Sequence, residues 1–366
     1  MQAKAQPGPP RLLCFAECRE EGVLPDIVSV SAASYHAQRA YLPGAEWSRI
    51  EDPRRLGWSP DGLEAAKGYA ATVPTASVMI VQSGLVVDEW GPTEQRYMCH
   101  SIRKSLLSAL YGIFVERGAI ELGRSLADLG IDDKEGLSER EKLATVYNLL
   151  LARSGVYHPT GFESPGMIAT REARHSHGPG TFWCYNNWDF NALGTIFEER
   201  AGTSIFAAFR DEIAVPLGMQ DFRYDDGRKD GEYVALEASR HPAYPFRLSA
   251  RDLARFGLLY LRLGRWGDRQ IVPEDWVRNS VLPYSDAGDH GAYGFMWWVT
   301  RQGIHYPGVI LPEGSYSARG VGGHVVLVIP SRELVIVHRV DTDIKETEVN
   351  AHQLGRLFGL ILAAAP

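Results

Sequence analysis

Lysine is scarce in this sequence, and strongly basic stretches are absent. Only seven of the 366 residues are lysine, no dense run of Lys and Arg occurs, and the formal net charge is -7 at pH 7. Proteins that bind nucleic acid through their electrostatics carry clustered positive charge. We therefore expect no nucleic acid partner.

Long apolar runs are missing as well. No stretch approaches the length of about 18 residues that crosses a membrane. The N-terminal stretch also lacks the continuous apolar segment of a signal peptide. These absences predict a protein without a membrane partner and with a cytoplasmic location.

Cysteine is rare for a chain of this size, which favours reduced thiols over a disulfide scaffold. The spacing of the cysteines fits no zinc ribbon. The four residues are Cys14, Cys18, Cys99 and Cys184.

Motifs for metals and cofactors are absent. His175 and His177 lie near Cys184, but neither a His-Glu-x-x-His nor a paired-cysteine motif accompanies them, so we expect no metal. There is no Gly-x-Ser-x-Gly elbow of an α/β-hydrolase, no Walker loop and no dinucleotide-binding glycine loop. We therefore expect no cofactor.

The composition itself is that of a globular protein, with 45% hydrophobic and 23% charged residues. Residues 1–70 are rich in Pro and Gly, which predicts a wrapping arm with little regular structure. In the remainder, 71–366, strand patterns gather at about 71–100 and 240–366, with a largely helical insert at about 101–240. This arrangement predicts an α/β (α+β) fold in which a cleft lies between a sheet region and a helical region.

Individual elements follow from periodicity and turn residues. Ser83-Gly84 predicts a two-residue hairpin turn between strands at 76–82 and 85–90. Further strands are predicted at 293–300, 324–330 and 333–340. Helices are predicted at 103–117, 141–152, 188–201, 203–215, 249–263 and close to the C-terminus.

Ser101 and Lys104 form the single Ser-x-x-Lys match in the chain. Residues three apart on a helix share one face, so the amine can reach the hydroxyl. A serine hydroxyl needs a nearby base to become a nucleophile, and a lysine becomes that base when burial removes its charge. The alternative interpretation makes Ser101 a helix N-cap and Lys104 a solvated residue of the first turn.

Two further motifs each have a structural and a chemical interpretation. Tyr185-Asn186-Asn187 contains the single Tyr-x-Asn match, which is either chemical or an aromatic residue packed before a capped helix. The glycine-rich segment 318–323 precedes an apolar strand. It either permits close backbone approach to a ligand or forms a bulge at a sheet edge.

In this order and spacing, the motifs give the sequence a resemblance to the serine-active β-lactamase and penicillin-binding-protein superfamily. The resemblance rests on Ser101-Ile102-Arg103-Lys104, Tyr185-Asn186-Asn187 and the segment 318–323, and it spans about 70–340. It points to the class C-like esterase and amidase branch, which includes 6-aminohexanoate-dimer hydrolases and family VIII-type carboxylesterases. It implies an antiparallel sheet flanked by N- and C-terminal helices plus a mainly helical subdomain.

The resemblance also implies roles for individual residues. Ser101 is expected to form an acyl-enzyme, Lys104 to take its proton, and Tyr185 to share the proton path. The backbone N–H groups of Ser101 and Val321 are expected to bind the oxyanion. The residues expected to contact the substrate are Asn187, Gly320 and Gly322.

One departure from the family pattern bears on the substrate. Ala318-Arg319-Gly320 stand where Lys-Thr-Gly or His-x-Gly is usual, so Ala318 offers no charge to a substrate carboxylate. If Ala318 faces the cleft, strand alternation turns Arg319 away from it. We therefore expect a serine hydrolase whose partner is a small-molecule carboxylic ester or linear amide. Alternatives are a catalytically silent scaffold or binding protein and, among enzymes, a β-lactamase or D-aminopeptidase; no oligomeric state is predicted.

Overall fold

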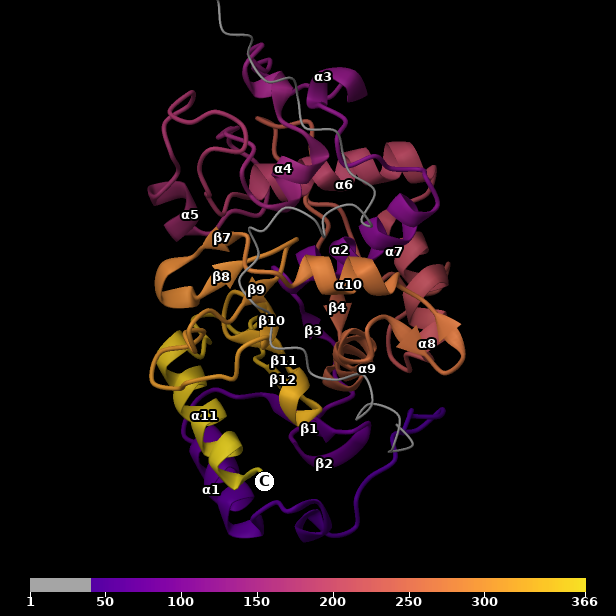
Figure 1. Ribbon diagram of the computed structural model, residues 1–366, viewed down its shortest axis with the longest axis vertical. Coiled ribbons are helices and arrows are strands. Elements are labelled where there is room, and N and C mark those ends of the chain that lie inside the picture. The colour runs from indigo at the N-terminus through magenta and orange to yellow at the C-terminus, as the bar shows by residue number, and fades with distance from the viewer. Residues whose placement is uncertain (1–40) are drawn as a thin grey trace, which may run out of the picture. The chain divides into compact units, whose positions relative to one another are not determined.

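An antiparallel sheet of eight strands organises residues 41–366, the part of the chain that the computed structural model describes (Figure 1). The strand order is β2-β1-β12-β11-β10-β9-β8-β7, so strands from opposite ends of the sequence meet at β1 and β12. The strands are β1 (Ser77–Gln82), β2 (Leu85–Trp90), β7 (Ser285–Asp286), β8 (Ala292–Tyr293), β9 (Trp298–Val299), β10 (Tyr316–Gly320), β11 (His324–Ile329) and β12 (Leu334–Arg339). Two small pairs lie outside this sheet, β3 (Tyr97–Met98) with β4 (Arg247–Leu248) and β5 (Arg265–Trp266) with β6 (Arg269–Gln270).

The hairpin formed by β1 and β2 has the turn that the sequence predicts. Ser83 and Gly84 have φ values of 52° and 87°, as a type I′ turn requires at both central residues. Between β11 and β12, the turn is a short 3-10 helix, Pro330–Arg332. These turns set the register that carries apolar side chains to both faces of the sheet.

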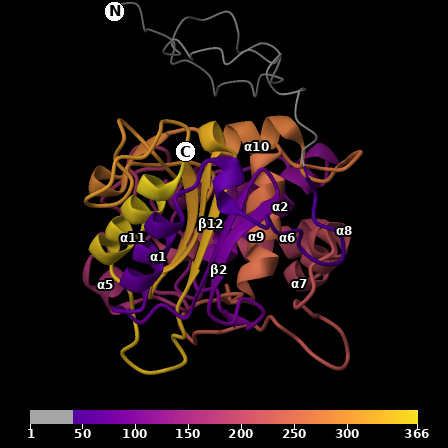
Figure 2. The same ribbon diagram turned by 90° about the horizontal axis from the view of Figure 1, so that it is seen from below.

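The sheet lies between two layers of helices. Met79 and Val81 of β1 face a core shared with α2 and α9, while Val78 and Ile80 face a second core shared with α1 and α11. Figure 2 shows α1 and α11 side by side on one side of the strands and α9 on the other. Near-continuous apolar strands are expected where both faces of a sheet are covered.

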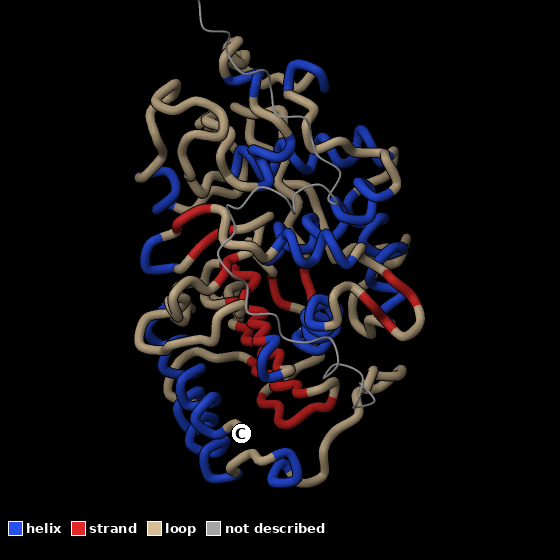
Figure 3. Tube along the Cα trace, in the orientation of Figure 1, coloured by secondary structure: helices blue, strands red, loops and turns tan. Residues whose placement is uncertain are grey.

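The helices are mostly amphipathic or buried and carry side-chain caps. The longer ones are α1 (Pro60–Ala70), α2 (Ile102–Glu116), α6 (Asn187–Ala201), α9 (Ala250–Leu261), α10 (Glu274–Ser280) and α11 (Ala351–Ala364). Shorter ones are α3 (Leu126–Leu129), α4 (Val146–Leu150), α5 (Pro165–Ala169), α7 (Ile205–Phe209) and α8 (Val215–Leu217). Figure 3 shows that most of the chain between α4 and α6 is loop.

Several elements differ from the sequence-based expectation. Residues 1–40 lie outside the described residues, but residues 60–70, expected to lack regular structure, form α1 against α11. The helix predicted at 141–152 is interrupted, because Thr145 extends and caps a new helix with its side chain. The predicted strand 293–300 is two short strands, since Met296 has a positive φ of 60° between them.

Candidate active site

Ser101 lies at the N-terminal end of α2. Its backbone occupies the N-cap position, but its hydroxyl makes no capping hydrogen bond. The hydroxyl oxygen lies 2.9 Å from Nζ of Lys104, one turn further along the same helix. The side chain is therefore not consumed by helix capping and is available for chemistry.

Lys104 is buried, with only 1% of its surface exposed. Its Nζ lies 2.5 Å from the phenol oxygen of Tyr185 and 4.4 Å from the centre of the Phe190 ring. Burial, reinforced by the neighbouring Arg103 cation, holds the pKa of Lys104 well below its usual range. The alternative interpretation of Lys104 as a solvated residue is therefore wrong.

The phenol of Tyr185 is neutral for the same physical reason. Burial raises the pKa of Tyr185 to about 12, because a phenolate would lose its hydration. The lowered pKa of Lys104 favours the neutral amine, whose lone pair then lies beside the Ser101 hydroxyl. The three side chains thus contain a nucleophile, a base and a second group that can carry a proton.

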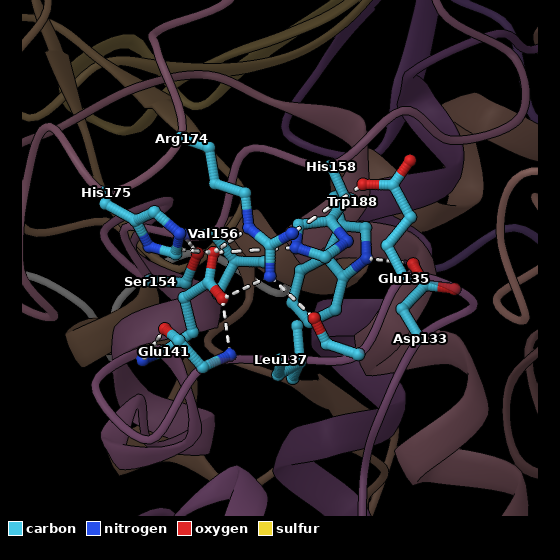
Figure 4. A network of polar contacts seen from close by, with 12 residues as sticks. Asp133, Glu135, Leu137, Glu141, Ser154, Val156, His158, Arg174, His175 and Trp188 are labelled. Atoms are coloured by element: carbon cyan, nitrogen blue, oxygen red, sulfur yellow. Dashed lines mark hydrogen bonds and ion pairs between the residues drawn. The ribbon is translucent and has the colours of Figure 1, made fainter.

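The start of α6 fixes the position of Tyr185. Asn186 caps this helix, with its side-chain oxygen accepting a hydrogen bond of 3.1 Å from the backbone N–H of Asp189. In the first turn, the indole N–H of Trp188 donates to Asp133 over 2.6 Å, as drawn in Figure 4. Asn186 is thus the helix cap, and Tyr185 is held directly before a rigid helix.

Ion pairs anchor the loop that leads to Tyr185. Figure 4 shows Glu141 at the centre of this network, with Arg174 donating to it over 3.0 Å. Arg174 also donates to the backbone carbonyl of Gly136 over 2.6 Å, and the N–H of Ser138 donates to Glu141 over 2.7 Å. Because Glu141 is buried, these contacts are weakly screened by solvent. They hold a segment that has almost no regular structure.

The two histidines considered as metal ligands belong to the same loop. Nδ1 of His175 lies 3.8 Å from Glu141, whereas Nε2 of His177 lies 3.6 Å from Glu172. The His177 ring stacks on Phe182 at 3.9 Å. Within residues 41–366, no group of three or more His, Cys, Asp or Glu side chains is placed to hold a metal ion.

Two of the four cysteines lie among the described residues. Cys99 and Cys184 are free thiols, and Cys14 and Cys18 lie outside the described residues. Among the helices of residues 41–366, none is long and apolar enough to cross a bilayer.

The second predicted oxyanion donor belongs to residues 320–323, which we call the oxyanion turn. A Cβ at Gly320 would lie 2.5 Å from the carbonyl oxygen of Cys99 and 3.2 Å from Cβ of His100. Only glycine permits this approach, which brings the turn against the residues that precede Ser101. Among residues 41–366, the N–H groups of Ser101 and Val321 meet no hydrogen-bond acceptor. Both are free to receive a ligand oxygen, and their shared role remains a prediction.

Gly322 and Asn187 are occupied by protein contacts. A Cβ at Gly322 would lie 2.5 Å from Cγ2 of Thr342, so a neighbouring loop fills the space that the glycine leaves. Nδ2 of Asn187 donates to the carbonyl of Phe162 over 2.6 Å, and its Oδ1 is buried without a partner in the described chain. A substrate contact at Asn187 therefore requires the loop around Phe162 to move.

Ala318 and Arg319 point to opposite faces of β10, as strand alternation predicts. Ala318 is buried in the core shared with α2. Arg319 donates to the carbonyl of His305 over 2.8 Å and to Oγ of Ser317 over 2.9 Å. Its guanidinium carbon also lies 4.1 Å from the centre of the Tyr306 ring. Arg319 is thus largely satisfied by the protein.

Three residues near the site were not found from the sequence. Arg103 is buried beside Lys104, Trp298 packs its ring 5.2 Å from that of Tyr185, and His100 precedes Ser101 with a positive φ of 47°. Arg103 lies inside the Ser-x-x-Lys motif, so its position was a usable signal. No local sequence pattern indicates Trp298 as a site residue, because its proximity to Tyr185 depends on the pairing of β9 with β10.

Two small cavities of the described chain lie away from Ser101, Lys104 and Tyr185. One, of about 60 Å³, is lined by residues that include Glu121 and Arg200, and the other, of about 110 Å³, by residues that include Asp230 and Arg247. Neither lining includes Ser101, Lys104 or Tyr185.

Comparison with known proteins places these observations in context. The family model described as Beta-lactamase matches residues 61–354. A curated uncharacterized protein of Alkalihalophilus pseudofirmus is 22% identical over 296 residues, which is 72% of this chain and 82% of that protein.

Solved structures share the fold at low sequence identity. A Bacillus anthracis protein provisionally named 6-aminohexanoate-dimer hydrolase has a TM-score of 0.59 at 20% identity, covering 88% of this chain and 86% of that one. A Bacillus halodurans penicillin-binding protein has a TM-score of 0.60 at 15% identity, covering 81% and 99%. A class C beta-lactamase has a TM-score of 0.61 at 14% identity, covering 83% and 95%. The predicted β-lactamase/transpeptidase-like fold is confirmed.

Proposed function

We propose that this chain, which belongs to the Beta-lactamase family, is a serine hydrolase that forms an acyl-enzyme through Ser101 and cleaves small carboxylic esters or linear amides. Membership of the family supports a hydrolase. The observation that carries the finer proposal is the position of a buried amine, Nζ of Lys104, between Oγ of Ser101 at 2.9 Å and the phenol of Tyr185 at 2.5 Å.

In the proposed acylation step, the lone pair of Lys104 accepts the hydroxyl proton of Ser101 while Oγ attacks the substrate carbonyl carbon. The carbonyl π electrons move to oxygen, and the N–H groups of Ser101 and Val321 bind the resulting oxyanion. The oxyanion electrons then re-form the carbonyl, the bond from the carbonyl carbon to the leaving oxygen or nitrogen breaks, and the proton passes from Lys104 through the phenol of Tyr185 to that leaving atom. In deacylation, water attacks the acyl-enzyme carbonyl through the same proton path. The bond from the carbonyl carbon to Oγ of Ser101 then breaks, which restores the serine hydroxyl.

The proposed preference for neutral substrates rests on the third motif. No lysine projects from β10 beside Ser101, and the guanidinium of Arg319 is engaged with His305 and Ser317 on the opposite face of the strand. A missing charge-assisted hydrogen bond to a carboxylate is worth about 1.5 to 3 kcal/mol. Substrates that depend on such a bond, β-lactams among them, should therefore bind and react poorly.

The experiment that tests the proposal is labelling with a fluorophosphonate probe, read by intact mass. We expect a single adduct on the wild-type chain and none on the Ser101→Ala variant. The matched control is Ser108→Ala, which removes a buried hydroxyl from the same helix and should leave labelling intact. An unlabelled wild-type protein, or a folded Ser101→Ala variant that still hydrolyses an activated ester, would overturn the assignment and favour a catalytically silent binding protein.

A further inference from the structure

The hydroxyl of Thr342 lies between two histidines that flank the site from different parts of the chain. Its Oγ1 lies 2.8 Å from Nε2 of His100, the residue before Ser101, and 3.4 Å from Nε2 of His324, the first residue of β11. The two imidazole rings are 5.2 Å apart. One hydroxyl thus connects the residue that precedes the proposed nucleophile with the strand that follows the oxyanion turn.

Arg339, His324, Thr342 and His100 are linked by successive hydrogen bonds. The direction of each bond follows from the guanidinium of Arg339, because that group can only donate. Nε of Arg339 lies 3.0 Å from Nδ1 of His324, so Nδ1 must be the acceptor and the proton of that ring lies on Nε2. His324 therefore donates to Thr342. The single hydroxyl proton of Thr342 is then left to donate to Nε2 of His100.

Burial favours the neutral form of both imidazole rings, His100 and His324. Burial lowers the pKa of His100 to about 4, with the Arg339 cation acting in the same direction, and it holds the pKa of His324 well below its usual range. Asp343, which pairs with Arg247 at 2.7 Å, is the acidic group that opposes the shift at His100. A neutral His100 keeps the acceptor nitrogen that the Thr342 hydroxyl requires.

The oxyanion turn is fixed by the same group of residues. Cγ2 of Thr342 occupies the space that a side chain at Gly322 would need. The carbonyl of Gly322 accepts a hydrogen bond of 3.0 Å from the N–H of Val349. Nδ1 of His338 donates to the carbonyl of Gly323 over 2.7 Å. The turn therefore has several contacts that limit its movement.

His100 has a backbone conformation that needs such support. Its φ of 47° lies in the left-handed region, which costs a residue with a Cβ about 1 kcal/mol or more unless its surroundings favour it. The side-chain bond to Thr342 contributes to that support, together with the Phe162 ring, which stacks on His100 at 6.0 Å. Because the peptide that joins His100 to Ser101 carries the Ser101 N–H, the conformation of His100 sets the direction of that donor.

We propose that Thr342 and His100 are positioning residues for the oxyanion hole, holding the Ser101 N–H and the Val321 N–H at a fixed separation. The proposal rests on the proposed function, since it assigns a task to residues around the same Ser101. Misaligned donors should weaken stabilisation of the tetrahedral state more than binding of the substrate. The expected signature is a loss in kcat with little change in KM.

The test compares Thr342→Val, which keeps the shape but lacks the hydroxyl, with Thr342→Ser, which keeps the hydroxyl. Using p-nitrophenyl butyrate, we expect Thr342→Val to lose about 10-fold in kcat, with KM within about 2-fold. Thr342→Ser, which lacks only the Cγ2 contact with Gly322, should lose clearly less than Thr342→Val. Affinity for an alkylboronic acid, which forms a tetrahedral adduct with the serine, should fall by the same factor as kcat. The matched control is Thr347→Val in the same loop, which should behave as wild type.

A second variant, His100→Asn, removes the same hydrogen bond and keeps the test usable if Thr342→Val fails to fold. Asparagine tolerates the left-handed conformation, so His100→Asn should fold while losing the bond to Thr342. It should show the same loss in kcat and in boronic acid affinity. An unchanged kcat in folded Thr342→Val and His100→Asn, or a change confined to KM, would overturn the inference while leaving the hydrolase intact. A wild-type chain that neither turns over the ester nor reacts with the fluorophosphonate would overturn the proposed function, and this inference with it.

Discussion

Arg103 lies directly beside Lys104 in α2, and both side chains are excluded from solvent. The guanidinium of Arg103 donates to Oδ1 of Asn191 over 2.8 Å and lies 4.2 Å from the centre of the Tyr244 ring. Within the described chain it forms no ion pair with a carboxylate. A permanent, uncompensated cation therefore adjoins the amine that must stay uncharged to act as a base.

Removing that cation should shift the pH dependence of catalysis. Desolvation and then Arg103 lower the pKa of Lys104, so Arg103→Met should raise this pKa and leave less neutral amine at a given pH. We expect the acid limb of the kcat/KM profile for a nitrophenyl ester to move to higher pH. The control is Arg103→Lys, which retains a positive charge and should keep the limb near its wild-type position. Superimposable limbs for wild type and folded Arg103→Met would show that Arg103 does not set this pKa.

The same buried amine should cost the fold stability. The folded-state pKa of Lys104 is depressed, so below its ordinary value of ~10.4 the unfolded chain binds a proton that the folded chain does not. Stability is therefore lost as pH falls from that value toward the folded-state pKa. Lys104→Met, similar in volume, should raise Tm at pH 7 by roughly 3 °C or more, and the gain should shrink near pH 10.5. Thermal melts of both proteins across this range check it, and a Tm difference independent of pH would contradict it.

Lys104 and Tyr185 should behave as one proton path. Lys104→Ala and Tyr185→Phe are each expected to lower kcat by at least ~100-fold, the lower range for lost acid-base catalysis. Because the two groups lie 2.5 Å apart and share one proton route, the double variant should lose little more than either single variant. Steady-state kinetics of all four proteins provide the measurement. Multiplicative losses would mean that the two residues serve separate steps.

Substrate class can be decided on a single preparation. With no lysine on β10 beside Ser101 and with Arg319 facing the other side of the strand, short neutral esters should be turned over and a cephalosporin only weakly. The expected difference in affinity for the carboxylate-bearing substrate is roughly 10- to 150-fold. Parallel assays of p-nitrophenyl butyrate and a cephalosporin check this. A higher kcat/KM for the cephalosporin would mean that Arg319 or another cation reaches the substrate carboxylate.

Local patterns were sufficient for much of the fold. The Ser83-Gly84 turn and the end of α6, where Gly202 takes a left-handed conformation, follow directly from residues that tolerate those backbones. β10 was harder, because Tyr316–Gly320 lacks a run of apolar residues and is held as a strand by its neighbours β9 and β11. α1 does not follow from the composition of residues 1–70, because their Pro and Gly content favours irregular structure. In the structure, Ser59 is the N-cap of α1 and Pro60 lies in its first turn.

The part of the site that lies within one helix turn could be predicted from the sequence. The reach from Lys104 to Ser101 is fixed by helix spacing alone, whereas the contact with Tyr185 depends on α6 packing beside α2. His100 and Thr342 could not be paired from the sequence, since they are far apart along the chain and meet only through the sheet. The roles of Val321, Asn187, Gly320 and Gly322 remain predictions.

The pairing of β1 with β12 sets the order in which the site can assemble during synthesis. β1 and α2 leave the ribosome well before β12, the strand that pairs with β1 along its whole length, from Ser77 with Arg339 onward. Until then β1 has an unpaired edge, and α2 lacks the sheet face against which it packs. Until β12 is made, the nascent chain therefore exposes the apolar strand β1 and the helix α2, whose side chains are buried in the finished fold. A released fragment that ends before β12 would contain Ser101, Lys104 and Tyr185 but not the closed central sheet on which they are mounted.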